Sequence, residues 1–184
     1  MALILIKETG AGLANANSYA DVADADVYHE GHLYATAWTS ATVDKKTAAL
    51  VMASRLIDAE YQFGGVKTAD SQALQWPRYR CPDPDRDPMM RFGRLQIWED
   101  WLPENLVPKA VVQATCEMAR AMLIEDRTAN PLGEGLKFTG LGANQTSFDK
   151  SDRRPVITAL AQAMLAKYGS QISTKSGAVR LIRT

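Results

Sequence analysis

Apolar residues recur at helical spacing along much of the chain, and Gly, Pro and Asn separate the stretches. A first helix is predicted after Asp21, whose side chain can cap it, and it should end near Gly31. A second helix is predicted to open at Thr42 or Asp44 and to close by Gly64 and Gly65. The predicted buried face of this second helix consists of Ala48, Val51, Met52, Leu56 and Ala59.

Two further helices are predicted in the second half of the chain. The third begins at Pro108, because proline suits a first turn, and ends at Asn130 and Pro131. Its predicted buried face consists of Ala110, Val111, Ala114, Met118, Ala121 and Met122. The last helix begins at Pro155 and stops at Gly169.

Strand signals are shorter than the helical ones. Residues 3–6 form a β-prone apolar run, which predicts a strand near the amino terminus. Residues 136–139 and 146–148 flank a tip containing Gly and Asn, and they predict a β-hairpin within residues 135–149. The expected fold is mainly α, a small bundle of about four helices with a β-hairpin, a long irregular loop and an extended carboxyl-terminal tail. We expect one helical domain over residues 1–169 and a tail over residues 170–184.

Helical periodicity disappears between residues 66 and 105, and the stretch is punctuated by Pro77, Pro82, Pro84 and Pro88. Loops of this length are uncommon in compact domains and usually have a function or are disordered. The residues expected to anchor the loop on the body or on an adjacent subunit are Leu74, Trp76, Arg78, Trp98 and Trp101. The alternative is that the tryptophans only cover the helical core from the loop.

Basic and acidic side chains balance, with twenty-one of each and a net charge of zero. This balance predicts no long-range attraction to nucleic acid or to an anionic membrane. The carboxyl-terminal end is the exception, because every charged residue after Asp152 is basic. Cys81 and Cys116 lack the spacing of a metal or redox motif, and the apolar run at residues 2–6 is too short for a signal peptide or a membrane span. We therefore expect a soluble cytoplasmic protein with free thiols.

No motif in the sequence supports catalysis or a cofactor. Asp26, His29 and His32 are spaced so that two of them can share a helical face, which is compatible with a zinc site, but a solvated helix end is the favoured interpretation. The acidic alternation at residues 83–87 is interrupted by prolines, so a solvated acidic corner is favoured over a calcium site. Cys116 is expected to pack in the core. We expect no enzymatic activity, no cofactor and no metal.

Several segments occur in a characteristic order. They are NANSY at residues 15–19, DVADADVYH at 21–29, LIDAEY at 56–61, QALQWPR at 72–78, VPKAV at 107–111 and ATCE at 114–117. In this order, and over residues 1 to about 168, the chain resembles the head-tail connector, or adaptor, proteins of tailed bacteriophages. Related chains are also labelled as similar to DnaT, a primosomal protein that binds single-stranded DNA.

The resemblance implies a structural virion protein at the head-tail interface, present in the host cytoplasm during assembly and without a membrane partner. About twelve copies would form a ring beneath the portal protein. The ring would extend the DNA channel, let genomic double-stranded DNA pass without sequence readout and give a tail or nozzle protein a platform. In such adaptors the carboxyl-terminal segment commonly reaches the portal. The residues expected to dock there are Val179, Arg180, Leu181, Ile182, Arg183 and Thr184.

Two alternatives stay open. A DnaT-like protein of replication would need a basic groove with stacking aromatics, whereas Trp98 and Trp101 lie among acidic residues. A stopper or tail-completion protein of the same assembly also fits the pattern. Residues 82–94 form an insertion relative to shorter relatives, so the resemblance implies no role for them.

Overall fold

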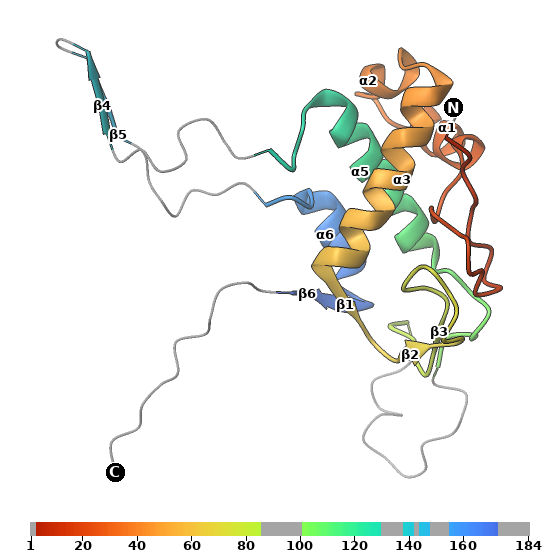
Figure 1. Ribbon diagram of the computed structural model, residues 1–184. Coiled ribbons are helices and arrows are strands. Elements are labelled where there is room, and N and C mark those ends of the chain that lie inside the picture. The colour runs from red at the N-terminus through yellow and green to blue at the C-terminus, as the bar shows by residue number, and fades with distance from the viewer. Residues whose placement is uncertain (1–2, 86–100, 130–137, 142–143, 148–154, 173–184) are drawn as a thin grey trace, which may run out of the picture.

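Two long helices, α3 (Val43–Glu60) and α5 (Lys109–Ile124), lie side by side at the centre of the molecule (Figure 1). Three shorter helices pack against α5, namely α1 (Val22–Glu30), α2 (Thr36–Thr39) and α6 (Ala159–Leu165). Helix α5 therefore contacts every other described helix and organises the core.

The computed structural model describes residues 3–85, 101–129, 138–141, 144–147 and 155–172. Over these ranges the predicted mainly α fold is confirmed, with five helices and three short antiparallel strand pairs. None of the helices in these ranges has the length and apolar content needed to cross a membrane.

The core between α3 and α5 is built from large apolar residues spaced about two helical turns apart. Leu50 and Ile57 of α3 and Val111 and Met118 of α5 are completely buried. The buried residues between them include alanines, whose short side chains let the two helix backbones approach closely. Burying each large side chain contributes about 1.5–3 kcal/mol of transfer free energy.

The predicted buried face of α3 is largely wrong. Val51 is buried, but Ala48, Met52 and Ala59 are exposed, and Leu56 is half-buried. Alanine occurs all around this helix, so the apolar pattern does not distinguish its two faces, and packing against α5 decides between them. For α5 the prediction is confirmed at Val111, Ala114, Met118 and Ala121.

Helix α1 begins and ends as predicted. The Asp21 carboxylate accepts a hydrogen bond from the Asp24 N–H (2.8 Å), and the Asp24 carboxylate accepts one from the Asp21 N–H (3.0 Å). This reciprocal pair is a capping box, which satisfies two N–H groups at the start of the helix. Gly31 is the C-cap of α1, as predicted, and Thr42, one of the two predicted starts, is the N-cap of α3.

Other helix boundaries differ from the prediction. Helix α3 ends at Glu60 rather than at the glycines, because β1 (Tyr61–Phe63) follows at once and pairs with β6 (Gly169–Gln171). Helix α5 ends at Ile124, before Asn130 and Pro131. Helix α6 begins only at Ala159, since the Thr158 hydroxyl caps it by accepting a hydrogen bond from the Ala161 N–H (3.2 Å). Helix α2 was not predicted.

The strand predicted at residues 3–6 is absent from the described structure, where only Lys7 pairs with Ser18 in an isolated bridge. A buried carboxylate organises the loop that follows. The Glu8 side chain accepts backbone N–H hydrogen bonds from Gly10 (2.8 Å), Gly12 (3.0 Å) and Leu13 (2.8 Å). The apolar run is therefore tied to the loop that follows it instead of entering a sheet.

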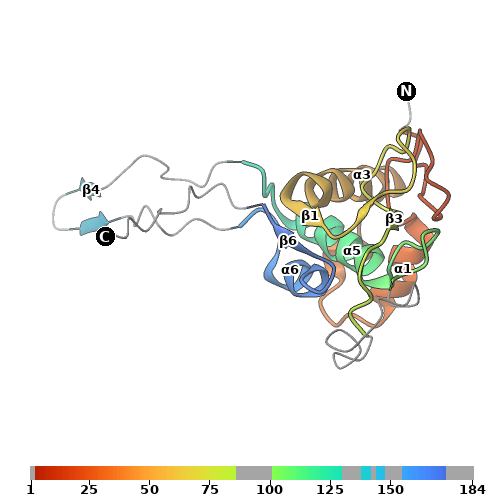
Figure 2. The same ribbon diagram turned by 90° about the horizontal axis from the view of Figure 1, so that it is seen from below.

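The predicted hairpin is confirmed. Strands β4 (Phe138–Leu141) and β5 (Asn144–Ser147) pair antiparallel, from Phe138 opposite Ser147 to Leu141 opposite Asn144. The hairpin stands well apart from the helices in both ribbon views (Figures 1 and 2). Residues 173–184, which include all six predicted portal-docking residues, lie outside the described residues.

The predicted loop over residues 66–105 is partly ordered into a two-stranded ribbon. Strands β2 (Val66–Lys67) and β3 (Arg78–Tyr79) pair antiparallel, with Val66 opposite Tyr79. Pro82 and Trp101 form a further isolated bridge, and the Leu102 N–H donates to the Cys81 carbonyl oxygen (2.9 Å). The two described ends of the loop are thereby held together.

Candidate functional site

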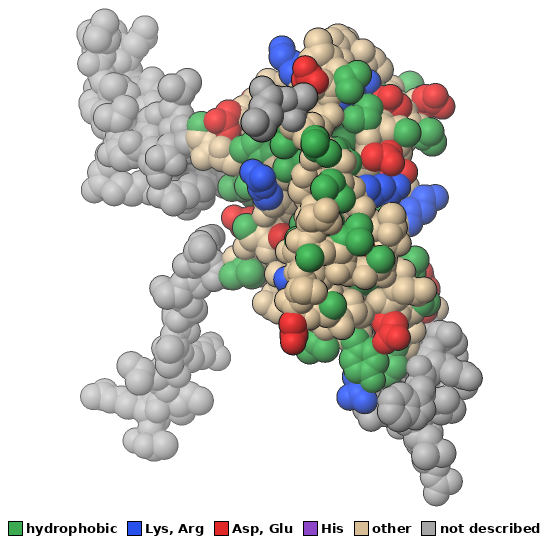
Figure 3. All heavy atoms as spheres, turned by 45° about the vertical axis from the view of Figure 1, so that its right-hand side comes forward, with side chains coloured by type: hydrophobic (Ala, Val, Ile, Leu, Met, Phe, Trp, Pro, Cys, Tyr) green, Lys and Arg blue, Asp and Glu red, His purple; other side chains and the backbone are tan. Residues whose placement is uncertain are grey.

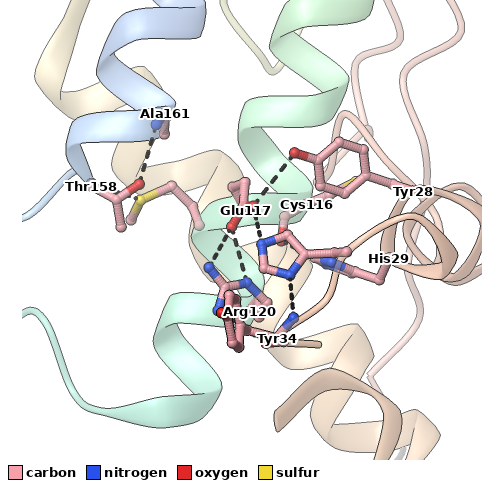
Figure 4. Close-up of polar contacts among 10 residues, drawn as sticks. Tyr28, His29, Tyr34, Cys116, Glu117, Arg120, Thr158 and Ala161 are labelled. Carbon is pink, nitrogen blue, oxygen red and sulfur yellow. Dashed lines mark hydrogen bonds and ion pairs between the residues drawn. The ribbon is translucent and has the colours of Figure 1, made fainter. Parts of the chain in front are cut away.

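A buried carboxylate lies where α1, the turn after it and α5 meet. Glu117 is 1% exposed, although it sits in the middle of α5. Its Oε2 accepts hydrogen bonds from Arg120 Nε (3.0 Å) and Nη2 (2.9 Å), and its Oε1 faces His32 Nε2 (3.2 Å) and the Tyr28 hydroxyl (3.4 Å). In Figure 4, Tyr28 and Arg120 reach the carboxylate from opposite sides. Charge-assisted hydrogen bonds thus replace the water that this carboxylate loses on burial.

The buried imidazole of His29 lies next to this cluster. Its Nε2 lies 3.2 Å from the carbonyl oxygen of Cys116, and because a carbonyl only accepts, Nε2 carries the proton. His29 Nδ1 has no hydrogen-bond partner among the described residues. Burial lowers the pKa of His29, and its ring packs against Trp38 with 5.1 Å between ring centroids. A sealed, neutral imidazole of this kind is a packing element rather than a general base.

The cluster positions the turn between α1 and α2. His32 Nδ1 accepts a hydrogen bond from the Tyr34 N–H (3.0 Å), and Arg120 Nη1 donates to the Tyr34 carbonyl oxygen (3.4 Å). Two large side chains of the turn are left in solvent, with Leu33 91% and Tyr34 77% exposed. The polar cluster therefore fixes the backbone of a turn that carries exposed apolar side chains.

The cluster offers no metal site and no nucleophile within the described residues. The Asp26 carboxylate, which the sequence placed near His29 and His32, makes other contacts. Its Oδ1 accepts hydrogen bonds from Trp38 Nε1 (2.7 Å) and Lys46 Nζ (2.7 Å). No group of three or more His, Cys, Asp or Glu side chains in the described part of the chain could hold a metal ion. Burial raises the pKa of the Cys116 thiol to about 12, so the thiol stays protonated, and its predicted place in the core is confirmed.

The motif at residues 72–78 lies inside the body. Leu74, Trp76 and Arg78 are all buried. The Trp76 ring packs edge-on against Phe63 (5.6 Å between centroids) and against Tyr168 (6.1 Å), and the Trp76–Pro77 peptide bond is cis. Trp76 therefore contacts β1 and the residue before β6 within its own chain.

Arg78 clamps neighbouring backbone. Its guanidinium donates to the carbonyl oxygens of Gly64 (2.6 Å), Gly65 (2.7 Å) and Gln75 (3.0 Å), and also to Gln75 Oε1 (3.0 Å). These acceptors engage all three guanidinium nitrogens, so Arg78 ties the end of the loop to the glycine pair after β1. Of the other predicted anchors, Trp101 is half-buried and Trp98 lies outside the described residues.

A second buried polar group supports the same motif from α3. The Tyr19 hydroxyl donates to the Asp58 carboxylate, and the Gln75 N–H lies 3.0 Å from both Asp58 Oδ2 and the Tyr19 oxygen. Burial raises the pKa of Asp58 to about 6 and outweighs these hydrogen bonds, which favour the charged form. The turn before Trp76 is therefore held by a carboxyl group that titrates in the mildly acidic range.

Immediately after the motif, an aromatic and a basic side chain meet at the surface. Tyr79 is 37% exposed, and the guanidinium carbon of Arg80 lies 5.1 Å from the centroid of its ring. Val66, opposite Tyr79 in the β2–β3 ribbon, is also exposed. We call Val66, Tyr79 and Arg80 the ribbon ledge.

Charges of both signs are interspersed over the face drawn in Figure 3, and no broad basic area occurs among its described residues. Several basic side chains are engaged by carboxylates. Lys7 lies 2.5 Å from Asp24, Lys46 lies 2.7 Å from Asp26, and Lys167 lies 3.3 Å from Asp85. On this face the described residues therefore provide isolated basic positions and no continuous track for a phosphate backbone.

Glu117 and the ribbon ledge were not singled out from the sequence. For Glu117 a signal was present, because a carboxylate between Ala114 and Met118 interrupts the apolar face of the third predicted helix. Its partners Tyr28 and His32 are far away in sequence, so no local pattern joins them. Tyr79 and Arg80 directly follow the recognised motif but share no periodicity with it.

Comparison with known protein families gives one whole-chain match. A family described as "Putative DnaT-like ssDNA binding protein" matches residues 1–184. No curated protein matches the chain. No solved structure matches it either.

Proposed function

The chain belongs to the DnaT-like family, whose description names single-stranded DNA binding. From the order of its sequence segments, which resembles that of phage adaptors, we propose that it is a structural assembly protein, the head-to-tail adaptor of a tailed bacteriophage. Copies of the chain would form a ring beneath the portal protein, and formation of this ring would depend on the hairpin. The observation that supports this proposal is the β4–β5 hairpin, which stands apart from its own helical body in both ribbon views (Figures 1 and 2).

An isolated two-stranded hairpin is only marginally stable in water. Strands β4 and β5 pair with each other, and neither pairs with another strand in the described part of the chain. Each therefore presents a row of N–H and C=O groups along its outer edge. A surface on a second protein molecule would satisfy these groups, and in a ring each copy offers that surface to its neighbour.

The resemblance to adaptors supplies the remaining partners of this proposal. The portal protein would bind the carboxyl-terminal residues 179–184, a tail or nozzle protein would bind below, and double-stranded DNA would pass through the lumen without sequence readout. The protein would act in the virion, after assembly in the host cytoplasm, and without enzymatic activity. The sealed His29 imidazole and the protonated Cys116 thiol support the absence of catalysis at the Glu117 cluster.

The test compares the full chain with a variant in which residues 138–147 are replaced by a short Gly-Ser linker. Sedimentation velocity and negative-stain imaging, with and without a portal protein of a tailed bacteriophage, measure assembly. We expect rings, or rings on the portal, for the full chain and a monomer of unchanged helical circular dichroism for the variant. Identical assembly of the two proteins would contradict the role of the hairpin, and a full chain that neither forms rings nor binds the portal would contradict the adaptor proposal.

Single-stranded DNA binding is a second candidate, because the description of the matching family favours it. The interspersed charges of the face drawn in Figure 3 argue against an extended binding groove there, which would require a basic track with several aromatics. Fluorescence anisotropy of a labelled oligothymidine at increasing salt separates the two candidates. Tight binding that weakens steeply with salt, together with a monomeric protein, would favour this second function over the adaptor.

A further inference from the structure

We propose that residues 31–43, which run from the end of α1 through α2 to the first residue of α3, receive the β4–β5 hairpin of a second copy of this chain. We call residues 31–43 the receiving segment. The inference rests on the proposed adaptor function and deepens it, because it names the two surfaces that meet between neighbouring copies in the ring.

The receiving segment holds large apolar side chains in solvent. Leu33 is 91% exposed, Tyr34 is 77% exposed and Val43 is 65% exposed. Among the large apolar side chains of the described residues, Leu33 and Tyr34 are the two most exposed. Adjacent apolar side chains of this size in solvent mark an interaction surface, and tyrosine is enriched at interfaces between proteins.

Buried charge fixes the backbone that carries these side chains. His32 accepts a hydrogen bond from the Tyr34 N–H, Arg120 donates to the Tyr34 carbonyl oxygen, and both of these side chains contact the buried Glu117 (Figure 4). Burying a carboxylate is costly, and here the contacts that compensate it also hold a short surface turn in one shape. A turn that is ordered in advance loses little conformational entropy when a partner binds.

The electrostatic character of the two surfaces matches. Residues 31–43 contain no Lys, Arg, Asp or Glu, and neither do residues 138–147 of the hairpin, although 23% of the chain is charged. His32 can be protonated, but its Nε2 already faces Glu117 (3.2 Å). Contact between the two surfaces would therefore bury no unpaired charge, and interface cores are depleted of charged residues for this reason.

The hairpin also needs a partner that offers polar groups. Strands β4 and β5 pair with each other and with no other strand of the described residues, so their outer edges carry unpaired backbone groups. The receiving segment exposes Thr36 and Thr42 as well as its apolar side chains. A hydroxyl group can donate and accept, so these side chains can bond with either kind of backbone group on the hairpin edge.

The positions of the two surfaces favour contact between copies. The helical body lies between the hairpin and α1 in both ribbon views, and the receiving segment begins where α1 ends (Figures 1 and 2). A hairpin that extends away from one body can reach this segment on another. Because the two surfaces differ, the contact is heterologous and repeats head to tail, and such contacts generate a ring when the rotation between copies closes.

The first test introduces a charge into the receiving segment of the full chain, and sedimentation velocity over a range of concentrations measures assembly. We expect Leu33→Asp to weaken self-association by about tenfold or more, because it removes an apolar contact and buries an unpaired carboxylate. Its circular dichroism should be unchanged, since Leu33 is exposed. Val66→Asp, which changes a 59% exposed apolar residue on β2, is the matched control and should assemble like the wild type.

The second test mixes two assembly-deficient variants. The Leu33→Asp copy keeps its hairpin, and the copy with a linker in place of residues 138–147 keeps its receiving segment. One contact can therefore form between the two copies, but no ring can grow from it. We expect a 1:1 heterodimer in the mixture at concentrations where each variant alone is a monomer.

The outcomes separate the receiving segment from the function on which it rests. If the wild-type chain neither forms rings nor binds a portal protein, both the adaptor proposal and this inference are overturned. If the wild type assembles and Leu33→Asp assembles equally well, or if the mixture gives no heterodimer, only the receiving segment is overturned. If Val66→Asp weakens assembly as much as Leu33→Asp, the loss is not specific to the receiving segment and the assignment also fails.

Discussion

Glu117 and Arg120 lie one turn apart on α5, and two guanidinium nitrogens of Arg120 donate to the same carboxylate oxygen of Glu117, at 3.0 and 2.9 Å. The carboxylate is buried, while the arginine side chain keeps some contact with solvent. The pair joins the helical core to the exposed Leu33 and Tyr34 turn, because Arg120 also donates to the Tyr34 carbonyl oxygen. The contact between Glu117 and Arg120 therefore depends on the opposite charges of the two side chains.

We expect Glu117→Gln to destabilise the protein by about 2 kcal/mol. The amide keeps the shape of the side chain but leaves Arg120 without a buried counter-charge. The loss stays below that of a fully buried pair, because the Arg120 and His32 side chains are partly exposed. Urea unfolding measures the effect, and Glu30→Gln, which changes an exposed carboxylate at the end of α1, should stay within about 0.5 kcal/mol of the wild type. Equal stabilities for the two variants would show that the Glu117 contacts contribute nothing.

Short-range patterns of the sequence predicted the fold class and several helix ends. Asp21 and Gly31 are correct predictions because a cap depends on only a few neighbouring residues, and of the two predicted starts of α3, Thr42 or Asp44, the structure has Thr42. The hairpin was predicted for the same reason, since a Gly- and Asn-containing tip between β-prone segments determines it locally.

Features that depend on long-range packing were missed. Ala48, Met52 and Ala59 fit a buried helical face, yet α5 packs against the side that carries Leu50 and Ile57. A helix rich in alanine leaves that choice to tertiary contacts. Likewise, the partners of Glu117 come from a helix and a turn near the other end of the chain, so no local pattern joins them.

Asp58 makes stability depend on pH in the mildly acidic range. Its pKa rises from 3.8 to about 6 on folding, so the native state binds this proton more tightly than the unfolded state. Its contribution is therefore fully present below pH 4 and is lost as the pH rises through 6, with an upper limit of about 3 kcal/mol. We expect the stability difference between the wild type and Asp58→Asn to change across this window and to be constant above pH 7. The comparison requires urea unfolding of both proteins at several pH values, because the lowered pKa of His29 acts in the opposite direction in both. A difference that does not vary with pH would contradict the raised pKa of Asp58.

Trp76 is expected to support the stability of the single chain. It is completely buried against Phe63 and Tyr168, so Trp76→Ala should leave a large cavity and destabilise the protein by about 3–5 kcal/mol. Tyr34→Ala removes an aromatic ring that is mostly in solvent and should change stability by less than about 0.5 kcal/mol. Chemical unfolding at concentrations where the protein is monomeric checks both values. If Trp76→Ala were as stable as the wild type, its ring would not be a core element of the single chain.

Gly65 places the end of β3, and with it the ribbon ledge, against the backbone after β1. Its φ is +71°, and an added Cβ would clash with the Tyr79 carbonyl oxygen at 2.3 Å. We expect Gly65→Ala to destabilise the protein by about 2 kcal/mol or more, through both backbone strain and this close contact. Gly31→Ala is the matched control, because Gly31 has a negative φ and the nearest atom to an added Cβ is 3.9 Å away, so its effect should stay within about 1 kcal/mol. Thermal unfolding midpoints of the two variants test this prediction. Equal midpoints would mean that the ribbon can move away from Gly65 and that the ledge is not held rigidly.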